Sequence, residues 1–170
     1  AWFKNRKKEK MREFHETRTR PLSGTRDKIK GEIACVKIFY KNKGQCLKDN
    51  QIKLGKDDEG VDVIVEEHGK KTLFQVTHLQ REAVRVLFKG WSYFGKGKTV
   101  EEIKANIEKV IMDKKPKGRA DIILLLDSLL PLPDVKLLDR AVAKLSTKSC
   151  FKGIYIVTPK HNIPVKRHLE

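Results

Sequence analysis

The chain has little cysteine: three of its 170 residues, Cys35, Cys46 and Cys150, with no C-x-x-C pair among them. An odd number without paired spacing favours neither a disulfide framework nor a cysteine-ligated zinc site. The five histidines are dispersed, with no H-E-x-x-H and no H-x₃₋₅-H pair, so the common histidine zinc motifs are absent from the sequence as well. We therefore expect the cysteines to be packing residues in a reducing, cytoplasmic environment.

Long hydrophobic runs are also missing. The longest apolar run, Ile122 to Leu126, is far shorter than the roughly 20 residues that a membrane-spanning helix needs. No signal-peptide pattern opens the chain. We expect no membrane partner. A chain of 170 residues has the length of one domain with its own core.

Negative charge is the scarcer sign, with 22 acidic residues against 38 lysines and arginines and a net charge of +16. Such an excess fits a phosphate-backbone partner, because basic side chains displace condensed counterions. A solubilising surface or a basic tail is the alternative, and residues 1–20 carry eight of the basic and three of the acidic residues. Since most of the excess lies beyond this segment, we expect a nucleic-acid partner, DNA before RNA.

Three segments are expected along the chain. Residues 1–24 have the composition of a basic N-terminal arm or helix that ends in a linker, because Pro21 and Gly24 break regular structure. Residues 25–168 are expected to form a single domain. Residues 169–170 are expected to be the remnant of a tag, and further domains or subunits beyond this stretch are left open.

Residues 25–43 have the periodicity of an amphipathic helix that ends at Gly44. Glu32 falls inside the apolar arc of that helix, so it is either an edge glutamate that pairs with a lysine or a functional residue. Both interpretations are open. The arc is formed by Ile29, Ile33, Val36, Phe39 and Tyr40.

The remaining pattern alternates strands and helices. Strands are expected over 51–54, 61–66, 72–78, 120–127 and 151–157, and helices over 100–113, capped by Thr99, and 134–144. The continuous apolar run at 120–127 is typical of a strand that is covered on both faces. This order predicts an α/β domain in which a mixed central sheet is flanked by helices.

A tight hairpin is expected at His68-Gly69, with Gly69 at positive φ. A two-residue loop there places Asp62 opposite Gln75, with Thr77 on the same face one step along. We expect these three side chains to form one polar cluster. A structural hydrogen-bond patch is one interpretation of such a cluster.

The stretch E-G-V-D-V-I-V-E-E-H-G-K-K-T-L-F-Q-V-T-H, on this order of elements, resembles the PD-(D/E)xK nuclease superfamily. Members often carry G-x-D followed across a hairpin by (E/Q)-x-K, and many place a Glu on the first helix. The resemblance implies a restriction-endonuclease-like fold with a helix-β-β-β-helix-β core, to which this chain adds a helix and a strand. It implies that Asp62 and Gln75 ligate Mg²⁺ or Mn²⁺, on the sheet face that meets the helix of Glu32, a third catalytic group.

The implied activity is metal-dependent hydrolysis of DNA phosphodiester bonds, in which the metal stabilises charge and activates water. Thr77 stands where the family has a catalytic lysine, and Lys28, one turn before Glu32, is the candidate for a migrated replacement. The sequence therefore leaves two functions open. One is an endonuclease, and the other is a catalytically inactive nuclease-like domain that binds nucleic acid.

Residues 79–98 combine basic and aromatic side chains, as in loops that contact nucleic acid. The aromatic residues either stack on bases or anchor the loop. The sequence G-K-G-K-T at 95–99 is not a P-loop, because the required glycine at position 92 is Ser92. The candidate nucleic-acid-binding residues are Arg81, Arg85, Lys89, Trp91, Lys96 and Lys98.

Overall fold

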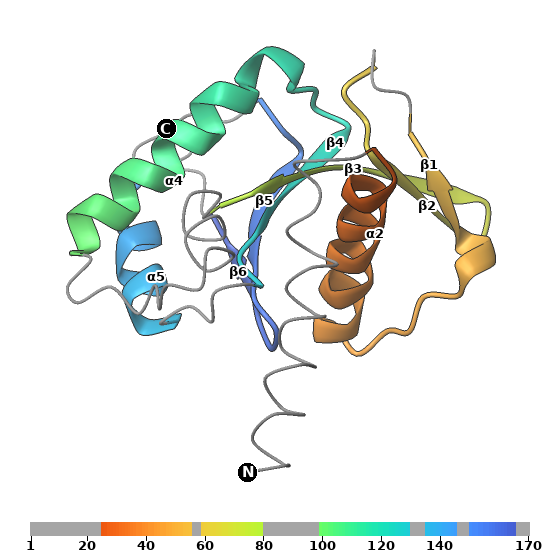
Figure 1. Ribbon diagram of the computed structural model, residues 1–170, viewed down its shortest axis with the longest axis horizontal. Helices are drawn as coiled ribbons and strands as arrows, with labels where there is room; N and C mark the ends of the chain where they lie inside the picture. The colour runs from red at the N-terminus through yellow and green to blue at the C-terminus, as the bar shows by residue number, and fades with distance from the viewer. Residues whose placement is uncertain (1–24, 56–58, 80–98, 130–134, 146–149, 166–170) are drawn as a thin grey trace, which may run out of the picture.

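The computed structural model describes residues 25–55, 59–79, 99–129, 135–145 and 150–165. These residues form an α/β domain in which a six-stranded mixed sheet carries helices on both faces (Figure 1). The strands lie across the sheet in chain order, from β1 to β6. The α/β class and the mixed sheet predicted from the sequence are therefore confirmed.

The described helices are α2 (Thr25–Asn42), α4 (Val100–Lys114) and α5 (Val135–Ala143), with short 3₁₀ turns η2 (Asp49–Gln51) and η4 (Lys115–Lys117). The strands are β1 (Ile52–Leu54), β2 (Val63–Glu67), β3 (Lys70–His78), β4 (Ile122–Asp127), β5 (Gly153–Val157) and β6 (Asn162–Pro164). Strand β6 was not predicted, because three residues ending in proline carry no alternation. In the described ranges, no helix combines the length and the apolarity that crossing a membrane requires.

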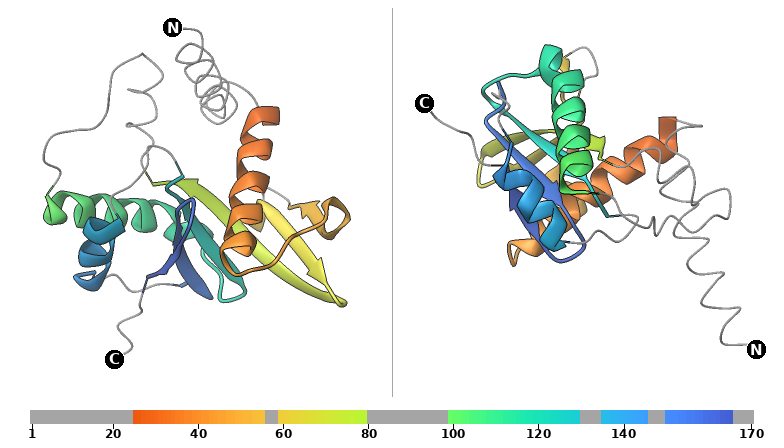
Figure 2. Two further views of the ribbon diagram at one scale, coloured as in Figure 1. Left: turned by 90° about the horizontal axis from the view of Figure 1, so that it is seen from below. Right: turned by 90° about the vertical axis from the view of Figure 1, so that its left-hand side faces the viewer.

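The helices of both parallel connections lie on one face of the sheet. Strands β1, β2 and β3 are antiparallel neighbours, β3, β4 and β5 run parallel, and β6 is antiparallel to β5. A parallel pair needs a crossover, which α4 supplies between β3 and β4 and α5 supplies between β4 and β5. Figure 2 shows α4 and α5 together on one side, with α2 on the other.

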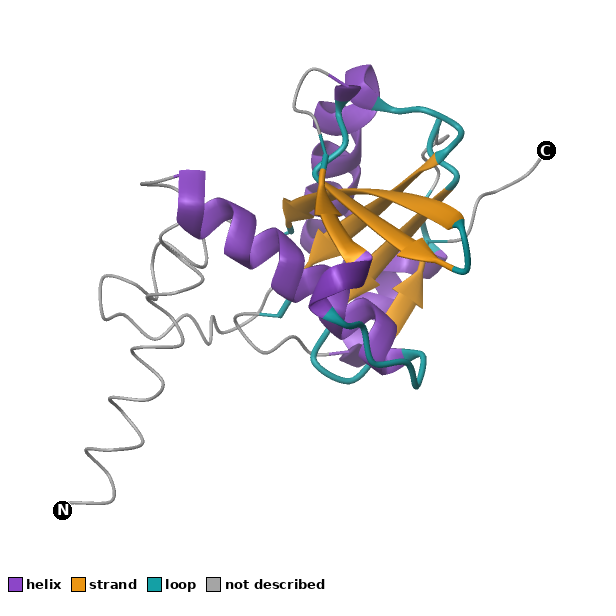
Figure 3. Ribbon diagram, turned by 90° about the vertical axis from the view of Figure 1, so that its right-hand side faces the viewer, coloured by secondary structure: helices purple, strands orange, loops and turns teal. Residues whose placement is uncertain are grey.

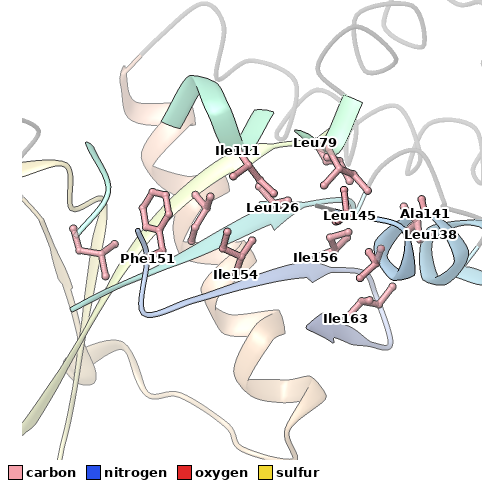
Figure 4. Packing of buried hydrophobic residues seen from close by; sticks show 14 of the residues in the cluster. Leu79, Ile111, Leu126, Leu138, Ala141, Leu145, Phe151, Ile154, Ile156 and Ile163 are labelled. Carbon is pink, nitrogen blue, oxygen red and sulfur yellow. The ribbon is translucent and has the colours of Figure 1, made fainter. Parts of the chain in front are cut away.

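The sheet separates two hydrophobic clusters. Leu124 and Leu126 of β4 join the cluster under α4 and α5, whereas Leu125 joins the cluster under α2. All three are completely buried, so the prediction of a strand covered on both faces is confirmed. Figure 4 shows the α4–α5 cluster, with Ile111 and Leu138 directed toward the strands.

The cluster under α2 is rich in aromatic rings. The Phe39 ring centroid lies 5.7 Å from that of Phe74 and 5.2 Å from that of Tyr155, both in edge-to-face geometry. Such pairs add about 0.5–1.5 kcal/mol each beyond the burial of apolar area. The helix above them ends at Asn42, and the predicted closing glycine, Gly44, lies in the turn that follows, with a φ of +79° and its N–H donated to the Lys41 carbonyl.

The predicted hairpin joins β2 and β3. His68 and Gly69 have φ values of +50° and +75°, the signs that a two-residue type I′ turn requires. The ladder runs from Glu67↔Lys70 to Val63↔Phe74, in the register that this turn length predicts. Figure 3 shows the strands of the sheet fanning out, as the right-handed twist of β-strands dictates.

Candidate functional site

Asp62 lies directly before β2, at the point where the hairpin register changes. In a regular ladder it would face Gln75, but its N–H donates to the Phe74 carbonyl at 2.9 Å. Phe74 also pairs with Val63, so two consecutive residues oppose one. This is a β-bulge, which locally disrupts the ladder. The expected regular cross-strand pair of Asp62 and Gln75 is therefore not formed.

The bulge directs the Asp62 carboxylate to the backbone of β3. Its Oδ2 accepts the Val76 N–H at 2.8 Å, so the carboxylate lies beside the peptide that joins Gln75 to Val76. It satisfies a backbone donor that a regular partner strand would otherwise pair. The Asp62 carboxylate thus lies beside β3 between Gln75 and Thr77, but its hydrogen bond is with the main chain.

Gln75 is buried within the sheet, with 2% of its surface exposed. Its neighbours Phe74 and Val76 pack in the cluster under α2, so the alternation of the strand directs Gln75 to the opposite face. Its partner on β4, Leu124, belongs to the α4–α5 cluster and confirms this side. Gln75 Oε1 has no hydrogen-bond partner within the described ranges, a situation that costs about 1–3 kcal/mol.

Glu32 lies on the buried side of α2, as its position in the apolar arc predicted, with 8% exposed. The Lys28 Nζ, one turn earlier, lies 3.8 Å from Glu32 Oε1. Because α2 packs on the face opposite to Gln75, the sheet separates Glu32 from Gln75. The expectation that Gln75 shares the face that meets the Glu32 helix is therefore wrong, since it ignored which face each strand residue presents to which helix.

The described residues do not assemble the Mg²⁺ or Mn²⁺ centre that the resemblance implies. Hard divalent cations prefer several oxygen ligands, carboxylates above all. Gln75 Oε1 has suitable chemistry, but the Asp62 carboxylate accepts a backbone hydrogen bond from Val76, and Glu32 is across the sheet. No group of three histidine, cysteine, aspartate or glutamate side chains able to hold a metal ion occurs in the part of the chain that the structure describes.

The carboxyl ends of β3 and β4 bring together two residues that were not singled out from the sequence. His78 pairs with Asp127 in the ladder, and its Nδ1 lies 3.6 Å from Asp127 Oδ2. Asp127 is 4% exposed, and its Oδ1 accepts the Leu129 N–H at 3.0 Å. Each residue ends a predicted strand, so knowledge that the two strands pair in parallel would have been the signal to join them.

The outward side of α2 carries a line of lysines, here called the α2 stripe: Lys30, Lys37 and Lys41. Spacings of seven and four residues place them on one line opposite the buried side of the helix, about 16 Å from first to last. Lys30 and Lys41 are exposed. Lys37 Nζ lies 2.8 Å from Asp49 Oδ1, and this hydrogen bond holds the pKa of the Asp49 carboxyl below its ordinary value.

The basic and aromatic loop residues predicted to contact nucleic acid fall within 80–98, outside the described residues, as does the N-terminal arm over 1–24. Their roles stay predictions. They are Arg81, Arg85, Lys89, Trp91, Lys96 and Lys98.

No protein-family model matches the chain, and comparisons with curated proteins and with solved structures found no match either. The likeness to the PD-(D/E)xK superfamily therefore depends on the motif alone.

Proposed function

We propose that this domain binds nucleic acid, DNA in particular, through the basic side of α2, on a nuclease-like α/β scaffold without a working catalytic centre. The α2 stripe is the observation that supports binding. Helix α2 carries five lysine or arginine residues and two acidic ones, of which Glu32 is buried. Lysines in a line suit a phosphate backbone, which they position without reading its sequence.

Three features favour binding over hydrolysis. Thr77 has no charge where the superfamily has a lysine. Gln75 is closed off from solvent, and Glu32 lies on the other side of the sheet from it. A hydrolytic site needs its groups to converge on one reacting phosphate within hydrogen-bond reach, and these residues diverge.

A matched pair of triple variants tests the proposal. Lys30, Lys37 and Lys41 are changed to Gln in one protein, and Lys104, Lys109 and Lys114 of α4 are changed to Gln in the control. Both lose the same charge from a helix. Affinity for duplex DNA, measured by fluorescence anisotropy over a salt series, should fall in the α2 variant, with the log–log salt slope reduced by up to about 2.7.

The control should keep a slope close to that of the wild type. Equal losses in the two variants would show that net charge rather than α2 drives association, and an unchanged α2 variant would remove the helix from the interface. Single-stranded DNA and duplex RNA probes in the same series establish whether DNA is preferred.

Metal-dependent DNA hydrolysis is the second candidate function. It is favoured by the position of the Asp62 carboxylate beside β3 between Gln75 and Thr77, where the motif would require it. Nicking of supercoiled plasmid with Mg²⁺ or Mn²⁺ tests it in the wild type and in Thr77→Lys and Asp62→Ala. Nicking by the wild type that Asp62→Ala abolishes would replace the binding proposal, whereas inert wild type and Thr77→Lys would leave binding as the function.

A further inference from the structure

A cavity of about 390 Å³ opens where the C-terminal end of α2 meets the turn between β5 and β6. We propose that this cavity binds a nucleoside phosphate, with the base against its aromatic side and the phosphate at its lysines. Its volume lies in the range of small-ligand sites, roughly 300–1,000 Å³. The proposal goes beyond the binding proposed for α2, because the α2 stripe is not part of the cavity.

The basic residues that line the cavity favour an anionic ligand. Lys43 enters it from the end of α2, and Lys160 and His161 enter from the turn, while none of the described residues that line it is acidic. Lys43 Nζ lies 5.0 Å from the centroid of the Phe39 ring and 5.4 Å from that of Tyr40. This cation–π geometry holds the ammonium group over the rings.

The turn that carries Lys160 is fixed to α2 by side-chain amides. Asn42 Nδ2 donates to the Thr158 carbonyl at 2.9 Å and to Asn162 Oδ1 at 3.0 Å. Within the turn, Thr158 N–H donates to the His161 carbonyl, and His161 N–H donates back to Thr158 Oγ1. The backbone segments that carry Lys43 and Lys160 are thereby fixed to each other before a ligand arrives, which reduces the entropy lost on binding.

The helix end is no obstacle to an anion here. A helix C-terminus carries partial negative charge on its last carbonyl groups. In α2, the Phe39 carbonyl accepts Asn162 Nδ2–H at 2.7 Å, and the Tyr40 and Lys41 carbonyls accept backbone N–H groups of the following turn. Since these carbonyls are already paired, the lysines set the local field.

The aromatic side of the cavity distinguishes a nucleotide from a bare anion. Tyr155, which is half-buried, lines this side with accessible ring surface, whereas Phe39 is 3% exposed and supports Tyr155 from the core, with ring centroids 5.2 Å apart. Inorganic phosphate could contact only the cationic side, and a nucleoside only Tyr155. A nucleoside phosphate uses both sides at once, so its affinity should exceed either part.

Calorimetric titration of the whole chain with adenosine 5′-monophosphate, adenosine and inorganic phosphate tests this difference. The monophosphate should bind at least about tenfold more tightly than either part, the effect of one charge-assisted contact. Lys43→Gln and Lys160→Gln should each weaken its binding by about tenfold. Lys109→Gln, which removes another exposed lysine, from α4, is the control and should change nothing.

Thermal unfolding of each variant verifies that it is folded. Equal affinities for phosphate and monophosphate would overturn the role of the rings, and equal effects of Lys43→Gln and Lys109→Gln would overturn the cavity. Oligonucleotides with and without a 5′-phosphate identify the source: a gain from the phosphate that Lys160→Gln removes indicates a strand end, and no gain indicates a free nucleotide. Monophosphate binding without duplex binding would refute the α2 proposal and keep the cavity, and the reverse result would do the opposite.

Discussion

Helices α2 and α4 cover opposite faces of one sheet and differ in charge. Helix α2 carries five basic and two acidic residues, whereas α4 carries three basic and four acidic ones. The cores beneath them differ too, since three aromatic rings contact the Phe39 ring in the cluster under α2, and the α4–α5 cluster is mostly aliphatic. The α2 face thus combines an excess of positive charge with an aromatic core, whereas the α4 face combines a small excess of negative charge with an aliphatic core.

The strands contribute to the difference between the cores but not to the difference in charge between the helices. Leucines of β4 supply both clusters from adjacent positions, whereas Phe74 of β3 and Tyr155 of β5 supply rings to the α2 side alone. The difference in charge resides in the outward side chains of the helices, which packing does not constrain. Surface charge on α2 can therefore be changed without cost to the core, which makes the comparison testable.

The largest expected effect is loss of stability from either face of β4. Leu125→Ala removes apolar volume under α2, and Leu126→Ala removes it under α4 and α5. Each leucine is completely buried, so each substitution should lower the free energy of unfolding by about 2–5 kcal/mol. Urea unfolding measures both. A loss well below 1 kcal/mol at one position would show that its face is not closed.

The bulge at Asp62 comes next. Asp62→Ala leaves the Val76 N–H without its carboxylate acceptor, which should cost about 1–3 kcal/mol of unfolding free energy. Asp62→Asn keeps an oxygen at the same place and should lose clearly less. The two variants are compared by denaturant unfolding, and equal losses would mean that the negative charge rather than the acceptor matters.

A stabilising change is expected on the α4–α5 side. Gln75→Leu replaces a buried side chain whose Oε1 has no hydrogen-bond partner in the described ranges with an apolar one of similar size. The free energy of unfolding should rise by about 1 kcal/mol. Duplex DNA affinity should stay unchanged, because Gln75 faces away from α2. A drop in DNA affinity would show that a change on the α4–α5 face affects binding at α2, and would contradict the independence of the two faces.

The smallest effect concerns alkaline pH on the α2 side. Burial raises the pKa of the Tyr40 phenol above its ordinary value, the hydrogen bond with Thr72 lowers it, and the nearby Glu67 raises it. Above about pH 10 the unfolded chain therefore releases a proton that the folded chain retains, so stability falls as pH rises. Unfolding at pH 8 and pH 10.5 should show a smaller decline in Tyr40→Phe than in the wild type.

Local signals predicted much of the fold. The His68-Gly69 turn specified its hairpin and register because only a few backbone conformations close a two-residue loop. The bulge escaped prediction, since V-D-V-I-V reads as uninterrupted alternation and its extra residue has no side-chain signature. Burial of Glu32 followed from helical spacing. Which face of the sheet this helix covers depends on tertiary packing. In the structure the helix covers the face opposite to Gln75, so Glu32 and Gln75 are separated by the sheet.

The parallel pairing of β3 with β4 also could not be predicted from local sequence patterns. His78 and Asp127 were both recognised as strand ends, yet 48 residues of chain between them hide the pairing of β3 with β4. The cavity at the end of α2 combines residues of that helix with β5, β6 and the turn between them. No spacing in the sequence connects Lys43 with Lys160, because the connection is made by the hydrogen bonds of Asn42 and Asn162.

Because α4 and α5 lie on the other face, the helical layer that the described residues form on the α2 side is one uninterrupted stretch of 18 residues, Thr25–Asn42. A single short cassette can therefore exchange this layer in the gene without altering α4 or α5. Only the inward positions that seat the helix, among them Cys35, Val36 and Phe39, have to be kept. The residues of one face of the domain can in this sense be redesigned independently of those of the other.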